Sequence, residues 1–387
     1  KNAITGFRSL EITAAGRYEQ FRNNDTDVAV PKFGIRWQPF DQQLTLRATW
    51  GQGFREPTLE ELFAAPISGL KLSHDPLNGG AFEPETNVLV LSNKSLEPEE
   101  SEAFSAGFVY TPKYVPGLNF SMDFWGVRRD KVIGSSPADE VLAREVAGKL
   151  LPGEVVERDI GGNITRIITQ NRNLGAQVAQ GIDFTLLYQR PIPVGTITFL
   201  SEWTWLYNFQ FQGGETAFGL GLDGGNLVGF TSDPGTSNEG FYEWKGNTRV
   251  SWDWKGFDAG ITARYIDGFD ELRPALQHHY VHQQFLFDLH VSYDFTALIP
   301  VEQKPVPGYS KEPSKDGKSI ATAEAGAADN SFKARLLRGT IITVGVNNLF
   351  DTDPPFASGE GGNGVGYPGF TYTAENRFWY WRLTKRF

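Results

Sequence analysis

Three histidines within five residues are the side chains whose type and spacing come closest to a chemical site. His278, His279 and His282 form a His-His-x-x-His run, and imidazole nitrogens spaced in this way can bind a metal such as zinc. The carboxylates of Asp267 and Glu271 are near them only along the sequence. We therefore expect no resident metal; transient contact with a metal or another ligand is the alternative.

The remaining patterns argue against an enzyme and against a bound cofactor. The chain has no cysteine and no Gly-x-Ser-x-Gly sequence. A thiol nucleophile and the sequence motif that presents the nucleophilic serine of α/β-hydrolases are therefore both missing. The glycine-rich run 359–364 lacks the strand–helix context of a phosphate loop. Arg55 and Glu56 are adjacent, but the glycines before them and Pro57 after them favour a role in shaping the chain, with Arg55 pairing to neighbouring carboxylates.

Two segments rich in glycine and aromatic residues are better suited to binding a small molecule. They run from 218 to 226 and from 356 to 370. Glycine lets the backbone approach a ligand closely, and loops often carry recognition. With the histidines, they give the residues that we expect to contact a substrate: Phe218, Asp223, Asn226, His278, His279, His282, Phe356, Asn363 and Tyr367.

Strands must position these residues, because apolar side chains recur at every second position along the chain. The last strand places Leu383, Trp381 and Trp379 on one face, interrupted only by Lys385, and a period of two is typical of a strand with two different faces. Similar runs predict about twelve strands. The clearest spans 196–211 and is expected to put these residues on one face: Ile197, Phe199, Trp203, Trp205, Tyr207, Phe209 and Phe211.

Composition agrees with an all-β membrane protein. The 387 residues include 43 glycines and 13% aromatic residues, and no stretch approaches the roughly 18 apolar residues of a transmembrane helix. The net charge of −10 argues against a nucleic-acid partner, because neutralising phosphates takes clustered cations. The start of the chain lacks the pattern of a signal peptide, so we expect a processed or partial chain.

The predicted connections alternate between short turns and long polar segments. The long segments span about 55–100, 130–179, 212–244, 266–283 and 351–376. Short turns at one end and long loops at the other are typical of a transmembrane β-barrel, whose long loops lie outside the cell. One connection, about 296–339, should be a short periplasmic turn and is instead a long Lys-, Ser-, Pro- and Ala-rich insertion. A disordered insertion and a docking element for a periplasmic partner are both open interpretations.

Three segments resemble the C-terminal barrel portion of a TonB-dependent outer-membrane receptor. The first runs from Leu46 to Phe63 and the second from Val344 to Pro355, and the third is the aromatic last strand. The first two resemble a strand exit and the penultimate strand of that family. The matching positions are Gly53, Phe54, Arg55, Pro57, Asn347, Asn348, Phe350 and Phe387.

The resemblance implies the last twelve strands or so of a 22-stranded barrel in the outer membrane of a Gram-negative bacterium, with the plug domain absent from this sequence. It also implies uptake of a scarce small-molecule nutrient, of the siderophore, cobalamin, haem or oligosaccharide class. The implied partners are membrane lipid, the TonB complex through the missing N-terminal part, and the barrel-assembly machinery through the last strand. The alternative is a passive porin-like channel of about twelve strands, although the mixed charges of the polar faces fit a selective open pore poorly.

Overall fold

The computed structural model describes residues 6–21, 26–212, 225–230, 240–271, 279–299, 332–357 and 366–386. Twelve long strands form one antiparallel sheet, in which they follow one another in chain order and each pairs with the next. Their bounds are β1 Ser9–Phe21, β2 Thr26–Gln38, β3 Leu44–Arg55, β6 Glu99–Tyr110, β7 Leu118–Asp130, β12 Ala176–Ile192, β13 Gly195–Gln212, β14 Trp244–Trp254, β15 Phe257–Ile266, β18 Gln284–Asp294, β19 Thr340–Asn347 and β20 Phe378–Lys385. The all-β, antiparallel architecture predicted from the sequence is confirmed.

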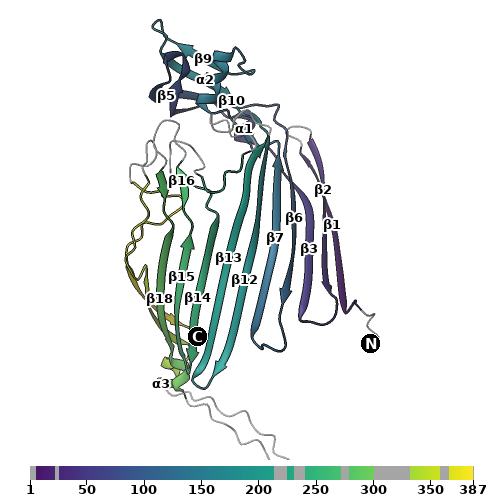
Figure 1. Cartoon of the computed structure of the whole chain (residues 1–387), viewed down its shortest axis with the longest axis vertical. Coiled ribbons are helices and arrows are strands. Elements are labelled where there is room, and N and C mark those ends of the chain that lie inside the picture. The colour runs from purple at the N-terminus through teal and green to yellow at the C-terminus, as the bar shows by residue number, and fades with distance from the viewer. Residues whose placement is uncertain are drawn as a thin grey trace, which may run out of the picture.

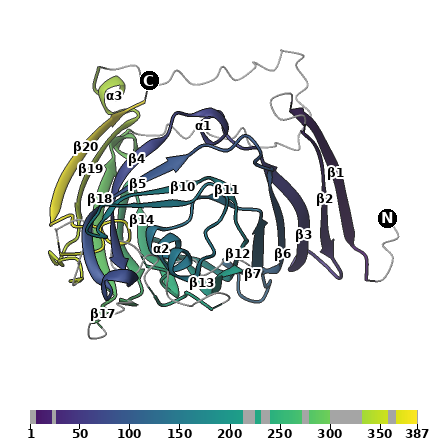
Figure 2. The same ribbon diagram turned by 90° about the horizontal axis from the view of Figure 1, so that it is seen from above.

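The sheet curves into an open trough with two ends of different character. In Figure 2, β1 and β20 stand at opposite sides of the opening, and they are the two edges of the described sheet. The tight connections β2–β3, β6–β7, β12–β13 and β14–β15 gather at the lower end of Figure 1, which we call the turn end. Long connections leave the opposite end, which we call the loop end.

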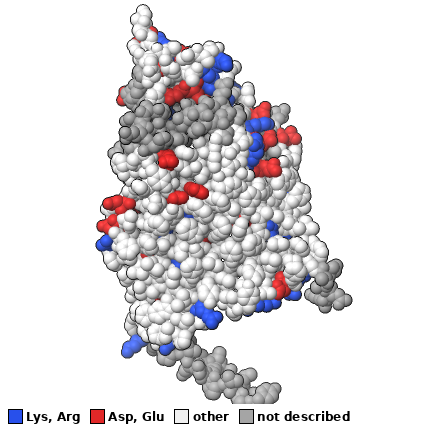
Figure 3. All heavy atoms as spheres, in the orientation of Figure 1, with Lys and Arg blue, Asp and Glu red and all other residues white. Residues whose placement is uncertain are grey.

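Aromatic side chains form a row near each end of the apolar face. At the turn end, Trp254 lies opposite Phe257, which lies opposite Tyr293. At the loop end, Trp205 lies opposite Trp244, and their rings stack with centroids 5.5 Å apart. The 11-residue strand β14 joins the two rows, a distance of about 34 Å along the strand and roughly 25 Å in height at the usual tilt. Charged side chains are sparse over the middle of the face seen in Figure 3, so this face has the dimensions of the apolar band of an outer-membrane barrel.

The expected faces of strand β13 are wrong beyond Tyr207. The register with β12 shifts between Gln180 and Gly181, which lie opposite Asn208 and Leu206. The extra residue of a bulge reverses the alternation from that point on. Phe209 and Phe211 consequently leave the face of Trp205, and Asn208 joins it, with its amide bonded to Gln180 Oε1 at 3.0 Å.

Two long connections fold together into a separate unit, the loop module, which stands above the sheet in Figure 1. A four-stranded sheet of order β4-β5-β10-β9 packs against one helix around Val88, Val141, Leu142 and Ile167. The parallel pairing of β5 with β10 joins the two connections. The bounds are α1 Leu59–Phe63, β4 Ile67–Asp75, η1 Pro76–Asn78, β5 Ala81–Leu91, β8 Ile133–Gly134, α2 Ala138–Ala147, β9 Val155–Arg158, β10 Ile164–Gln170 and β11 Arg172–Asn173.

A second small core ties two further connections together at the loop end. Strands β16 (Phe269–Glu271) and β17 (His279–Val281) form a hairpin ladder. Phe269, Val281, Ala357 and Tyr372 pack as a buried cluster. The hydroxyl of Tyr372 donates to the carbonyl of Asp267 at 2.6 Å, so the segment before β20 is fixed to the segment after β15.

At the turn end, the connection between β18 and β19 begins with η2 (Phe295–Leu298) and ends with α3 (Phe332–Leu337). Most of the predicted insertion, residues 300–331, lies outside the described residues. Among the helices described, none is long and apolar enough to cross a membrane.

Candidate functional site

The exit of strand β3 is built around the guanidinium of Arg55. This group forms paired hydrogen bonds to Glu99 at 2.8 and 2.9 Å and to Glu61 at 3.0 and 3.1 Å. The Glu99 side chain is buried and also accepts from Arg129 Nη2 and from the Ile133 backbone, both at 2.8 Å. Two cations and one buried carboxylate therefore lock β3, β6 and β7 together at the loop end, and all the carboxylate oxygens are occupied.

The residues around Arg55 turn the chain from strand to helix. Thr58 caps α1 by accepting from the Glu61 backbone, while Glu61 accepts from the Thr58 backbone at 2.7 Å, which is a capping box. Pro57 is buried. A Cβ on Gly53 would lie 2.8 Å from Ser101 Oγ, and Phe54 packs edge-on against Phe21 at 5.6 Å. These residues fix the direction in which the chain enters the loop module, and their polar groups are used within the protein.

Asn348 has a comparable role after β19. It is buried and has a positive φ of 51°, which asparagine tolerates better than most residues. Its side chain donates to the carbonyls of Thr352 and Glu375 and accepts from the Thr352 backbone, at 2.8 to 2.9 Å. Its neighbour Asn347 ends the strand, and Phe350 is exposed with its ring against Phe287.

The described histidines of the predicted cluster do not converge. His279 Nδ1 lies 2.9 Å from the buried Glu271 carboxylate, and its ring meets Phe356 edge-on. His282 instead packs edge-on against Tyr280. Within the described parts of the chain, no group of three histidine, aspartate or glutamate side chains is placed to hold a metal. His278 lies outside the described residues, as do Phe218, Asp223, Asn363 and Phe387.

Asn226 and Tyr367 are described, and the amide of Asn226 is taken up by the backbone. Its oxygen accepts from the backbone of Phe209 and Val228, at 3.0 and 3.1 Å, and its nitrogen donates to the carbonyl of Tyr207 at 2.8 Å. It therefore fixes the segment 225–230 on the end of β13. Tyr367 is half-buried and follows Gly366, whose carbonyl accepts from the backbone of Ala357 in the second small core at 2.9 Å.

The reversal of β13 creates an aromatic surface that the sequence did not indicate. Phe209 stacks on Phe241 with ring centroids 4.0 Å apart, and Phe211 meets Phe209 edge-on at 5.6 Å. These rings lie at the loop end on the face opposite Trp205. A ligand that enters on this face would meet stacked aromatic rings. The sequence did not indicate this surface because it depends on the bulge in β13, which no residue type marks.

The loop module is held by two buried ion-pair networks. Arg158 binds Asp75 at 2.6 and 2.9 Å and Glu145 at 2.8 and 3.1 Å, and Arg144 binds Glu154 at 2.7 and 3.0 Å. Hydrogen bonds from the Arg158 guanidinium lower the pKa of Asp75. For Glu154, burial raises the pKa, but the bonds from Arg144 and from the Leu151 backbone leave the net pKa lowered. Both carboxylates are therefore charged in the folded module at neutral pH.

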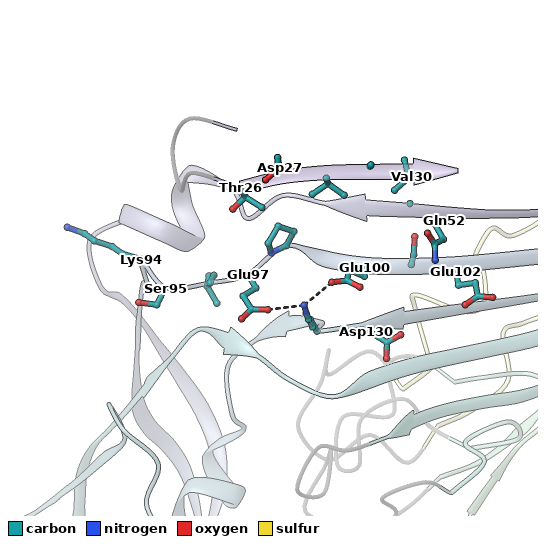
Figure 4. A pocket seen from close by; sticks show the side chains of 17 residues that line it. Thr26, Asp27, Val30, Gln52, Lys94, Ser95, Glu97, Glu100, Glu102 and Asp130 are labelled. Carbon is teal, nitrogen blue, oxygen red and sulfur yellow. Dashed lines mark hydrogen bonds and ion pairs between the residues drawn. The ribbon is translucent and has the colours of Figure 1, made fainter. Parts of the chain in front are cut away.

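A cavity of about 700 Å³ opens where β2 separates from β3 at the loop end. Figure 4 shows Asp27, Glu97, Glu100 and Glu102 lining it. Lys131 also lines the cavity, and its Nζ lies 2.9 Å from Glu97 and 2.8 Å from Glu100. Glu100 and Glu102 share their face of β6 with Phe104 and thus stand just beyond the loop-end aromatic row. The lining is mixed in charge: Lys131 is paired to two glutamates, and the ammonium of Lys94 lies over the ring of Phe63.

Comparison with known proteins agrees with this geometry. The family described as TonB dependent receptor-like, beta-barrel, matches residues 4–349. The fold is similar to a mutant ferric enterobactin receptor of Pseudomonas aeruginosa, with a TM-score of 0.61 and 15% identity over 98% of this chain and 43% of that one. It is similar also to the siderophore receptor PirA of Acinetobacter baumannii, with a TM-score of 0.60 and 14% identity over 98% of this chain and 44% of that one. No curated protein matches the sequence.

The chain thus spans less than half the length of the solved structures that it resembles. At such identities the structural likeness carries the fold alone, whereas the family match covers most of the sequence. This chain belongs to the TonB-dependent receptor family, to whose β-barrel part residues 4–349 correspond.

Proposed function

We propose that this chain is the C-terminal barrel portion of an outer-membrane receptor that takes up a scarce nutrient with energy supplied through TonB. The nutrient classes that fit are siderophores, cobalamin, haem and oligosaccharides. The observation that carries the proposal is the open sheet: within the part of the chain that the structure describes, the edge strands β1 and β20 are not paired with each other. An unpaired edge cannot remain in a bilayer, so further strands of a larger barrel, 22 in the family pattern, are needed to close it.

The polar face of the sheet supports a lumen filled by protein rather than an open pore. Arg47 donates to Asp123 across β3 and β7 through two guanidinium nitrogens, and Arg264 lies 2.8 Å from Asp288. Charged side chains that pair with one another in this way suit a barrel wall that hydrogen-bonds to a folded plug. A selective passive channel instead favours rings of side chains with the same sign of charge. On this account, a plug domain and the segment that contacts TonB are supplied by residues outside this sequence.

Substrate capture is assigned to the loop end. The loop module lies over the trough in Figure 2. The second small core and the aromatic surface of Phe209, Phe211 and Phe241 lie at the same end of the sheet. The connections at this end fall outside the cell if β20 ends in the periplasm, and aromatic rings there suit a bulky ligand with flat groups. A passive porin-like channel of twelve strands is the alternative, and it requires β1 to pair with β20.

The experiment is uptake by a strain that lacks the gene and is complemented with the full-length protein. The probes are radiolabelled ferric enterobactin, cobalamin, haemin and a maltodextrin, each added at an external concentration far below the one that saturates uptake. We expect one class to accumulate against its gradient and accumulation to stop when TonB is deleted. Entry that equilibrates without accumulating and does not depend on TonB would establish the passive channel instead.

A further inference from the structure

A lysine interrupts the apolar face of the last strand, and the structure shows what it does there. Lys385 follows Trp381 and Leu383 on that face. Its ammonium donates to the carbonyl oxygens of Arg335 and Leu336, both at 2.8 Å, and of Arg338, at 2.7 Å. The carbonyls of Arg335 and Leu336 belong to the last turn of helix α3, and that of Arg338 directly follows the helix, so they are not used by hydrogen bonds within it. Lys385 therefore caps α3 and holds it on the apolar, outward side of the sheet.

The register gives the level of α3 relative to the apolar band. Lys385 lies opposite Thr340, one step along from the pair of Leu383 with Ile342. Ile342 lies opposite Tyr293, so that pair continues the turn-end aromatic row. Aromatic rows mark the boundary between hydrocarbon and headgroups. Helix α3, which is bound just beyond the row, stands at the level of the headgroups.

The side chains of α3 are arranged for that level. Phe332 and Leu336, four residues apart on one side of the helix, are 81% and 57% exposed, while Ala334 is buried against the protein. Lys333 and Arg335 flank the apolar pair and are exposed. Large apolar side chains rimmed by long cationic ones are typical of helices that lie in a membrane interface.

The cations of α3 favour an anionic surface. Among the described residues, neither Lys333 nor Arg335 forms an ion pair, and further cations lie nearby in Arg338 and Lys385. Basic side chains also gather at the lower edge of the surface in Figure 3. The nearest described carboxylate along the connection, Asp294, accepts from the Thr296 backbone at 2.9 Å. Phosphate groups of lipids would supply negative charge to these side chains, at about 1 kcal/mol for each cation near the surface.

We propose that Phe332, Lys333, Arg335 and Leu336 form a lipid-docking platform that binds anionic phospholipid headgroups in the leaflet at the turn end. The apolar pair enters the edge of the hydrocarbon, the two cations contact phosphates, and Lys385 holds the helix in place. The inference rests on the proposed function to the extent that the barrel spans the outer membrane, but it does not depend on uptake or on the nutrient.

The first test places a nitroxide spin label at position 336 through Leu336→Cys in the full-length receptor, reconstituted in phosphatidylethanolamine bilayers with and without phosphatidylglycerol. This chain contains no cysteine of its own. Collisions with oxygen, which concentrates in lipid, are compared with collisions with a water-soluble nickel chelate. Labels at Leu383→Cys and at Val146→Cys serve as lipid-facing and aqueous references. We expect the ratio of oxygen to nickel collisions at position 336 to lie between the ratios of the two references. The ratio should rise when phosphatidylglycerol is added, because the label then lies deeper in the membrane.

The second test counts phosphatidylglycerol molecules retained by the receptor in native mass spectrometry. The double variant Lys333→Gln/Arg335→Gln should retain less, by about fivefold for each charge removed. The matched control Arg36→Gln/Arg382→Gln removes two exposed cations from the polar face of the sheet and should retain the wild-type amount. Heat-modifiable migration on gels confirms that each variant is folded. A label at 336 as aqueous as the one at 146, or equal retention by both double variants, would overturn the proposal, and either result leaves TonB-dependent uptake untouched.

Discussion

Arg158 and Asp75, which are 83 residues apart in the sequence, join the two connections that form the loop module. The guanidinium of Arg158 meets both oxygens of the Asp75 carboxylate, at 2.6 and 2.9 Å. The Asp75 side chain is almost fully buried, and that of Arg158 is mostly buried. A buried pair contributes little net stability when it is intact, but removing one partner leaves an uncompensated charge. The pair therefore decides whether the loop module folds as one unit.

Arg158→Gln should loosen the loop module without unfolding the sheet. The orphaned Asp75 costs about 3 kcal/mol, which corresponds to roughly hundredfold faster amide hydrogen exchange in β4 and β9. Arg166→Gln is the control in the same module, since its ion pair with Glu157 is long at 3.6 Å and exposed. Equal exchange in both variants would show that the Asp75 pair has no special role.

The loop module should also loosen in acid. The folded pKa values of Asp75 and Glu154 lie below their ordinary values of 3.8 and 4.5. Their contribution is therefore complete above those values and is lost as the pH falls through the lower, folded pKa values. A fluorophore at Val146→Cys should keep its anisotropy from pH 7 to about pH 5 and lose it below about pH 4. The same label in the Arg158→Gln background should show a smaller step, and a step centred near neutral pH would contradict the assignment.

Asn348→Ala should weaken the exit of β19. The substitution removes three side-chain hydrogen bonds from a buried position and places alanine at a positive φ. We expect a loss of about 3 kcal/mol, measured as a lower urea midpoint for unfolding of the full-length protein in detergent micelles. Asn347→Ala, one residue earlier, is the control. If the control shifts the midpoint by the same amount, the hydrogen bonds and backbone conformation of Asn348 are not the cause, and the prediction is wrong.

Lys385→Met should release α3 while leaving the last strand in place. A cationic hydrogen bond contributes about 2 kcal/mol, and a helix of six residues has little stability of its own. Exchange of the α3 amides should rise roughly thirtyfold, and gel migration should still report a folded barrel. Arg382→Met, on the other face of the same strand, should leave α3 protected. If it does not, the effect lies in the strand and not in the cap.

Alternation predicted the main sheet because each strand has one lipid-like and one polar face. It failed at Phe209 and Phe211, where a single extra residue in β13 reverses the faces and no residue type marks the bulge. The loop module was predicted only as two long connections, because its parallel pairing of β5 with β10 brings together residues 79 positions apart (Ile167 and Val88). Such non-local pairing leaves no periodic trace within either segment.

The candidate site was only partly accessible from sequence for a similar reason. His279 and His282 are close in sequence, but His279 lies in β17 beside Glu271, whereas His282 follows the strand and packs against Tyr280. Asn226 looked like a ligand-contacting amide, yet its hydrogen bonds are made with the backbone of β13 and of its own loop. The sequence shows that Lys385 interrupts the apolar face of its strand. It does not show the contact with α3, because Arg335 and Leu336 lie 50 and 49 residues before Lys385.

The measurement that tests the central claim most directly is the intact mass and N-terminal sequence of the mature protein purified from its native outer membrane. A TonB-dependent receptor with this chain as its C-terminal part should have a mass roughly twice the 43.0 kDa of this chain, with a plug and a TonB-contacting segment upstream. A mature protein of about 43 kDa that begins at Lys1 would contradict the account and leave a small channel closed by β1 and β20.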